Sequence, residues 1–461
     1  MSTTAVDLAA IEGELILRDD SGFDAARIER IFNRRLPERM PAAVLRVASE
    51  QDVVLGVRLA RERGWKVAVR SGGHSWAQWS IRDDALVLDM AGLQELSYDE
   101  QSEIVQISPS VKGGAVLAPF LAERGRFFPG GHCPTVGVGG FLLQGGQGFN
   151  ARGWGWAAEH IAAIDLVTAE GELVRADEEN NSDLFWAARG AGPGFFGVVT
   201  RFHLRTMPAP GYLAETIQIY GLDAYDEVMT WLHEAHYRVP DTVEIVALTK
   251  TDPEIQDTPV LVVTGFALVA DEAEADQALA VFRESPALDR AIVVLDAVPT
   301  TMDKHRERQL EANPEGHRWA VDNAWVSGSA ADVVPAIKSS YVTLPNAKAF
   351  TIWFSMAPLR DLPDMAFSLQ SEIYLASYVL WDDPAEDEAH IAWLQGVMAE
   401  MQPVTLGQYL GDSDLSRRQV KFMADDNWAR LQEIRAVRDP EQMFVGYWAG
   451  EQSAANRNHW E

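Results

Sequence analysis

The sequence predicts an α+β protein built from two domains and a closing segment. At 461 residues, the chain is longer than one hydrophobic core usually serves. Short apolar runs alternate with helical patterns over the first two hundred residues. Longer alternating segments, typical of an antiparallel sheet, follow Pro208, Pro210 and Gly211. We therefore expect domains at 1–207 and 208–405 and a closing segment at 406–461.

The elements of the first domain follow from local patterns. Ser49 and Asp52 resemble a capping box, so we expect a helix from there through Arg61, ended by Gly64. The pair Glu170-Gly171 joins two branched apolar runs and predicts a hairpin. The remaining patterns predict strands at 66–69, 86–89, 104–108, 161–168, 172–175 and 197–205, and helices at 116–124 and 183–189.

The second half of the chain is predicted from longer alternating runs. Strands are expected at 243–249, 260–268, 291–298, 348–356 and 372–380, and helices at 270–283 and 425–437. Aromatic residues on or beside these strands have two interpretations, core packing or a stacking surface for a substrate. They are Trp319, Trp325, Trp353, Trp381, Tyr374 and Tyr378.

Composition and charge narrow the class of protein. The net charge is −29, from 68 acidic and 39 basic residues, which argues against nucleic acid and anionic membranes as partners. No run reaches the roughly 18 apolar residues of a membrane span. The acidic stretch 1–20 lacks the basic and apolar regions of a secretory signal, so we expect a cytoplasmic protein. The one cysteine, Cys133, allows no internal disulfide, and we predict no metal site.

A first glycine-rich motif, Arg70-Ser71-Gly72-Gly73-His74-Ser75, directly follows a predicted strand. Adjacent glycines let the backbone turn tightly and expose N–H groups, which suits a pyrophosphate. Taken alone, the motif is neither a dinucleotide fingerprint nor a Walker loop, and its histidine has the alternative of simple packing.

Two further glycine-rich segments follow, at 130–153 and 190–200. The first contains His132-Cys133-Pro134-Thr135-Val136-Gly137-Val138-Gly139-Gly140. Such density indicates either a tightly packed turn region or backbone held close to a flat, phosphorylated ligand. A lone cysteine is more often a small buried apolar residue than a functional group.

These motifs, in this order, resemble the berberine-bridge-enzyme-like branch of the vanillyl-alcohol-oxidase flavoprotein family. That family carries R-S-G-G-H, C-P-T-V-G-V-G-G and G-P-N-F-G-V-V-T segments. The third is matched by 192–200, with an aromatic in place of the asparagine. The family's closing helix is matched by Arg430, Leu431, Asp439, Pro440 and Phe444. The resemblance covers 21–206 and 427–444 and implies a two-subdomain FAD-binding domain of the PCMH type, a substrate domain with a helix-covered antiparallel sheet, and a closing segment that returns to the first domain.

The resemblance also implies how FAD is held. In the family, the histidine forms an 8α-histidyl bond and the cysteine bonds flavin C6, which here are His74 and Cys133. Some members lack the cysteine, so its presence implies the bicovalent subclass. The residues implied for FAD binding are Arg70, Ser71, Gly72, Gly73, His74, Ser75, His132, Cys133, Val136, Gly137, Gly139, Gly140, Gly145, Gly148, Asn150, Glu159, His160, Ile161 and Val198.

The implied reaction is hydride transfer from an alcohol, hemiacetal or amine carbon to flavin N5, with O2 reduced to H2O2. In the family, the third residue after the cysteine controls access of O2, and Val136 favours an oxidase over a dehydrogenase. The family's usual Y-x-N-Y base motif is altered here to Tyr409-Leu410-Gly411-Asp412. Asp412 is therefore the candidate base, with Tyr409 and Gln408 beside it.

Several alternatives stay open at this point. A flavin dehydrogenase with another electron acceptor and a flavin-loaded binding protein without a base both fit the altered motif. A nicotinamide enzyme is disfavoured because no G-x-G-x-x-G opens a helix in an early βαβ unit. The expected partners are O2 and a sugar, secondary alcohol or cyclic amine.

Overall fold

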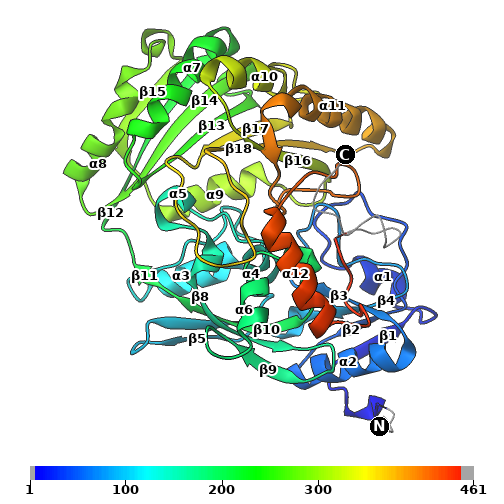
Figure 1. Ribbon diagram of the computed structural model, residues 1–461. Helices are drawn as coiled ribbons and strands as arrows, with labels where there is room; N and C mark the ends of the chain where they lie inside the picture. Colours follow the sequence, from blue (N-terminus) through cyan, green and yellow to red (C-terminus); the bar gives the residue numbers. More distant parts are fainter. Residues whose placement is uncertain (1–5, 448–461) are drawn as a thin grey trace.

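The computed structural model describes residues 6–447 and contains two smaller sheets, one large sheet and a short two-stranded ribbon (Figure 1). The α+β class is confirmed. Within residues 6–447, no helix combines the length and apolar character that crossing a bilayer requires.

The first small sheet has four strands and contains the parallel pairs β2–β4 and β4–β3. In spatial order, its strands are β1 (Glu14–Leu17), β2 (Ala43–Arg46), β4 (Ala85–Asp89) and β3 (Lys66–Arg70). Helices α1 (Phe23–Ile28) and α2 (Glu50–Arg63) connect them. The predicted capping box is confirmed: Ser49 accepts from the Asp52 N–H and Asp52 accepts in return, while Gly64 ends α2 in the left-handed region.

The second small sheet has five antiparallel strands. Its order is β5 (Leu96–Asp99), β6 (Ile104–Ile107), β10 (Val198–Arg205), β8 (Ile161–Val167) and β9 (Leu173–Ala176). The connections contain α3 (Ala118–Ala122), α4 (Val138–Leu143), α5 (Ala151–Trp154) and α6 (Ser182–Ala188), and the ribbon is β7 (Arg126–Phe127) with β11 (Met207–Pro208).

The large sheet has eight strands, and each pair of neighbouring strands is antiparallel. Its order is β15 (Val293–Pro299), β12 (Tyr212–Gly221), β14 (Gln256–Val269), β13 (Val243–Asp252), β17 (Phe350–Ser355), β18 (Ile373–Trp381), β16 (Arg318–Val326) and β19 (Thr405–Gly407). The helices of this half are α7 (Tyr225–Ala235), α8 (Glu272–Leu279), α9 (Met302–Ala312), α10 (Ala330–Val342) and α11 (Asp387–Glu400). Helices α7, α10 and α11 lie on the outer side of the sheet (Figure 1).

The end of the chain returns to the first two sheets. Helix α12 (Asp425–Arg438) packs against α6, where Arg438 forms an ion pair with Asp183. Beyond the helix, Phe444 forms a bridge with Val67 of β3, and its ring is buried in the same core as both small sheets. The last described residues therefore complete the first half of the molecule.

Some elements differ from the sequence patterns. The predicted helix at 116–124 is a wide turn over 113–117 followed by α3, because Pro119 lacks the N–H that would continue the earlier turn. The predicted helix at 270–283 is shorter, with α8 giving way to a 3-10 turn at 280.

Arg152 links the two halves of the molecule through hydrogen bonds. This buried side chain extends from α5, and its guanidinium donates to five backbone carbonyls of the other half. The acceptors are Ala357, Pro240, Val243, His236 and Val239, at 2.7, 2.7, 2.8, 3.3 and 3.0 Å. Burial lowers the Arg152 pKa to about 10, which still leaves the group charged at neutral pH.

Arg152→Met is expected to destabilise the protein by at least about 3 kcal/mol, because buried carbonyls that lose their donor are costly. Urea unfolding measures the loss. The matched control is Arg61→Met, which removes an exposed pair with Glu441 and should cost no more than about 1 kcal/mol. An equal loss of unfolding free energy in the two variants would contradict the role of Arg152 in linking the two halves.

Candidate active site

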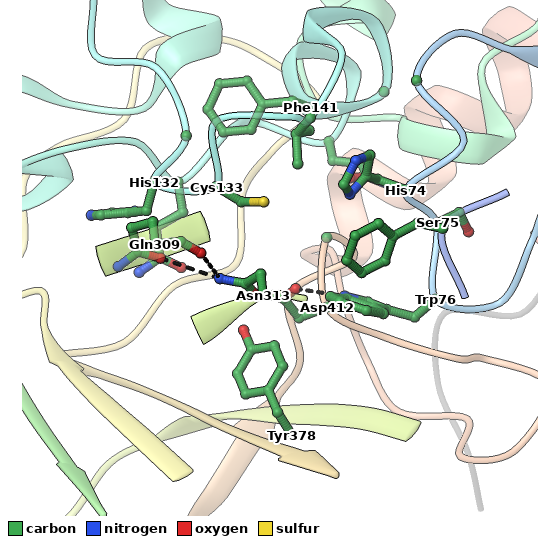
Figure 2. Close-up of a pocket in the computed structure, with 18 of the residues that line it drawn as sticks. His74, Ser75, Trp76, His132, Cys133, Phe141, Gln309, Asn313, Tyr378 and Asp412 are labelled. Carbon is green, nitrogen blue, oxygen red and sulfur yellow. Dashed lines mark hydrogen bonds between the residues drawn. The ribbon is translucent and has the colours of Figure 1, made fainter. Parts of the chain in front are cut away.

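A cavity of about 960 Å³ lies between the glycine-rich loops of the first half and the inner face of the large sheet. Figure 2 shows His74, Cys133 and Phe141 along one side of it, with Trp76, Asp412 and the Tyr378 hydroxyl across from them. The volume is at the upper end of the range for small-molecule and cofactor sites. The cavity therefore has room for a large cofactor beside a substrate.

The loop after β3 is held by the buried side chain of Arg70. Its guanidinium pairs with Asp89 at 2.7 Å and donates to the carbonyls of Ala26 and Arg27. Burial lowers the Arg70 pKa, and Asp89 opposes that shift. Arg70 thus anchors the loop, which places Ser71, Gly72, Gly73, His74 and Ser75 along the cavity.

Two glycine-rich loops approach each other backbone to backbone. A Cβ on Gly72 would lie 2.6 Å from the Gly137 nitrogen, and one on Gly139 would lie 2.7 Å from the Pro109 Cβ. Gly73 has φ +76, and a Cβ there would meet the Arg30 carbonyl at 1.9 Å. Only glycine allows this close approach, so the backbone itself forms this part of the wall.

His74 lies at the cavity wall with its ring stacked on Phe32, centroid to centroid 4.3 Å. Burial, with the nearby Lys112 acting in the same direction, lowers the His74 pKa to about 4. The imidazole is therefore neutral at neutral pH and has a lone pair available on one nitrogen.

Cys133 lies in the loop between β7 and α4, also at the cavity wall. Burial raises the pKa of its thiol, and the Thr135 hydroxyl, 3.5 Å from Sγ, opposes the shift. Figure 2 shows the sulfur on the same side of the pocket as the His74 ring. The two residues proposed to carry the flavin are thus brought to one cavity from loops 59 positions apart.

Asp412 lies at the centre of a polar cluster. Trp76 donates its Nε1–H to Oδ1 at 2.9 Å, and Tyr374 donates its hydroxyl to Oδ2 at 2.5 Å. Burial, together with the nearby Asp412, raises the pKa values of Tyr374 and Tyr378 well above that of a free tyrosine. Both phenols therefore stay protonated and serve as hydrogen-bond donors beside the carboxylate.

Tyr409 lines the cavity, but its hydroxyl is engaged with backbone. It accepts from the N–H groups of Gly146 and Gln147 at 3.1 and 3.3 Å. Burial raises its pKa, so it stays protonated at neutral pH. Asn323 donates to the carbonyls of Tyr409 and Asp412, both at 2.8 Å, and fixes this turn.

His132 forms a pair with Glu244 of β13. Its Nε2 lies 2.9 and 3.0 Å from the two carboxylate oxygens, and the Asn150 N–H also donates to Glu244, at 2.7 Å. Both His132 and Glu244 line the cavity. The pair joins the loop that carries Cys133 to the large sheet.

The structure does not bring all the sequence-predicted residues to the cavity. Gly137, Gly139, Gly140 and Val136 line it. Those outside its lining are Gly145, Gly148, Asn150, Glu159, His160, Ile161 and Val198. Gly148 packs on the Pro129 carbonyl, Glu159 pairs with Arg360 and His160 contacts the Trp154 carbonyl.

Sequence reasoning did not assign Tyr374 and Tyr378 to Asp412. The available signal was their spacing, because residues 374 and 378 point to the same face of β18. The spacing does not say whether that face is turned to the cavity or to the outer helices, because this depends on the strands that pair with β18.

The residues present fit FAD. Glycine backbone that no side chain can cover suits a pyrophosphate, and a neutral imidazole and a thiol both face the space beside it. The cavity extends past these groups to Asp412, which leaves room for a substrate.

Comparison with known proteins indicates the same cofactor. A family model described as an FAD binding domain matches residues 41–177. FAD-linked oxidoreductase nodO of Hypoxylon pulicicidum is 34% identical over 420 residues, which cover 90% of this chain and 93% of that protein.

Two solved structures share the fold. The 6-hydroxy-D-nicotine oxidase of Arthrobacter nicotinovorans superposes with a TM-score of 0.84 at 23% identity, over 97% of this chain and 100% of that one. Glucooligosaccharide oxidase of Acremonium strictum, described with 6-S-cysteinyl, 8α-N1-histidyl FAD, gives 0.81 at 19% identity, over 95% and 97%. The predicted PCMH-type architecture is confirmed by these likenesses.

Proposed function

Because the chain belongs to the FAD-linked oxidoreductases, in the berberine-bridge-enzyme-like branch of the vanillyl-alcohol-oxidase family, we propose that it is a bicovalent flavin oxidase. The observation that carries this proposal is the meeting of His74 and the sole cysteine, Cys133, at one cavity wall. Glucooligosaccharide oxidase is described with FAD bonded to one cysteine and one histidine, which supports the same two attachments here.

The proposed reaction oxidises an alcohol, hemiacetal or amine carbon of a small molecule. A bound FAD would supply the two-electron redox chemistry of this reaction, whose balance is a CH–OH group and O2 giving a carbonyl and H2O2. The protein must therefore orient the substrate and accept one proton from its O–H or N–H group.

Asp412 is the proposed proton acceptor. It faces the cavity and is fixed by Trp76 and Tyr374, so its orientation is set before substrate binds. The Tyr378 hydroxyl points into the pocket and is placed to donate to the substrate oxygen or nitrogen (Figure 2). Tyr409 acts as a positioning residue through its contacts with Gly146 and Gln147.

The substrate range is proposed from two proteins of the same fold, an oxidase of a hydroxynicotine and an oxidase of an oligosaccharide. A sugar, a secondary alcohol or a cyclic amine is the expected substrate, and O2 is the expected acceptor. The cytoplasmic location stays a prediction from the sequence.

A substrate screen with purified yellow protein tests this function. Under anaerobic conditions, a true substrate bleaches the flavin, and admission of air restores the colour with one H2O2 formed per substrate consumed. A flavin that bleaches but does not return rapidly in air would instead favour the alternative, a dehydrogenase with another electron acceptor.

Val136→Leu is expected to slow reoxidation by O2 by roughly tenfold, equivalent to about 1.4 kcal/mol in barrier. The reason is steric: Val136 lines the cavity, and an added methylene narrows the space beside the loop of Cys133. Stopped-flow mixing of reduced protein with O2 measures the rate. Val116→Leu, at an exposed position, is the control and should leave the rate unchanged.

A further inference from the structure

An apolar surface extends from the polar cluster across the inner face of the large sheet. The strand register places two rows of side chains across β12, β14, β13 and β17. One row is Ile217, Thr264, Val246 and Phe354, and the other is Ile219, Val262, Leu248 and Ile352, all of which line the cavity. We call these eight residues the apolar floor.

The floor lies on the side of the sheet where alternation predicts polar residues. On β13, Val243, Ile245 and Ala247 point to the outer helices and belong to their core. Val246 and Leu248 alternate with them, point the other way and are only half-buried. An antiparallel sheet with one packed face usually turns polar side chains to the other, so a continuous apolar inner face indicates an apolar occupant.

The floor offers a ligand no free polar group. Its one hydroxyl, on Thr264, donates to the Val246 carbonyl at 3.3 Å. The charged residues at its borders are paired within the protein: Glu215 with Arg308 and Lys250 with Asp252, at 2.7 and 2.8 Å. Sugar hydroxyls laid on this surface would lose water without gaining partners, which is costly for each group.

The floor is continuous with the proposed reaction centre. Phe354 of the floor is paired in register with Tyr374, whose hydroxyl donates to Asp412. Four strands separated by about 4.8 Å give the floor a width of about 14 Å. One molecule can therefore present its reacting carbon at Asp412 and lay the rest of its body across the floor.

We propose that the substrate is an alcohol or amine with an extended hydrocarbon body, alkyl or fused-ring, that lies on the apolar floor. This inference rests on the proposed function and narrows it, because it disfavours the oligosaccharides among the candidate substrates. The floor sets which molecule binds, whereas Asp412 and the flavin determine what happens to it.

The test is a binding series with the flavin-loaded protein, which needs no turnover. Binding of hexanol, octanol and decanol is followed by the change in flavin absorbance, with xylobiose as the sugar probe. Each added CH2 buried on the floor should lower Kd by about fourfold, the equivalent of about 0.8 kcal/mol. Xylobiose should bind more weakly than hexanol.

A variant localises the effect. Leu248→Gln puts an amide in the middle of the floor and should weaken decanol binding by about tenfold or more, because a buried leucine contributes about 1.5–3 kcal/mol. Leu173→Gln, on exposed β9, is the matched control and should bind decanol as the original protein does. Thermal unfolding verifies that both variants are folded.

The outcomes separate this inference from the proposed function. The proposed role of the apolar floor is wrong if alkanol affinity does not change with chain length, or if xylobiose binds more tightly than decanol. Either result would hold even if the protein makes H2O2. The expected alkanol series in a protein whose flavin no alcohol or amine ever bleaches supports the floor and overturns the oxidase.

Discussion

Replacing both His74 and Cys133 with alanine is expected to release the flavin on acid precipitation, whereas either single replacement should leave the pellet yellow. The two residues reach the same cavity from separate loops, so each of the two proposed bonds would hold the flavin without the other. Denaturation unfolds the glycine-rich loops and removes all non-covalent binding. Absorbance of the washed pellet and of the supernatant gives the fraction that remains attached.

The single variants show which bonds exist. Loss of the thioether in Cys133→Ala should change the visible spectrum, because a sulfur substituent on the ring alters its absorption. His390→Ala is the matched control, since His390 lies on α11, outside the cavity lining, and its removal should change neither spectrum nor retention. An unaltered spectrum in Cys133→Ala would mean that the second bond does not form.

Asp412→Asn is expected to slow flavin reduction by about 100-fold to 1000-fold, within the usual contribution of a positioned general base. The amide keeps the size of the carboxylate and one acceptor oxygen, but it cannot take a proton from the substrate. Its NH2 group also replaces the oxygen that accepts from Tyr374 or Trp76, so the cluster loses a hydrogen bond.

The rate is measured by anaerobic stopped-flow bleaching at saturating substrate. Asp226→Asn serves as the control, because Asp226 is exposed, pairs with Lys338 between the outer helices α7 and α10, and lies outside the cavity lining. Turnover that is the same in Asp412→Asn and in the original protein would remove Asp412 from the mechanism.

The glycine loops could be predicted from the sequence because their signal is local. Gly72, Gly73 and His74 follow a strand within a few residues, and the density of glycine around Cys133 is visible without any partner. Strands with long branched runs, such as β13 and β14, were predictable for the same reason.

The polar cluster around Asp412 could not be predicted because its members meet only through tertiary packing. Trp76 and Asp412 are 336 positions apart, and Tyr374 is 38 positions from Asp412. Strand β16 gave no clear pattern because Asp322 and Asn323 interrupt it. These two residues are polar because they bind Arg418 and the turn at Tyr409.

A position close to a motif in the sequence also did not predict whether a residue lines the cavity. Asn150 and Arg152 belong to the glycine-rich segment 130–153 but contact the large sheet and its loops instead of the cavity. Helix α9 has no buried residue, so it lacked the apolar stripe by which a helix is recognised in a sequence.

The single cysteine of the chain allows the proposed attachment of flavin to be counted. In denatured protein, every free thiol must belong to Cys133, because no other cysteine exists. A colorimetric thiol titration therefore reads one equivalent per chain when the sulfur is free and none when it is bonded to the ring. Applied to samples taken at intervals during expression or reconstitution, the same titration would measure the rate at which the sulfur becomes bonded to the flavin.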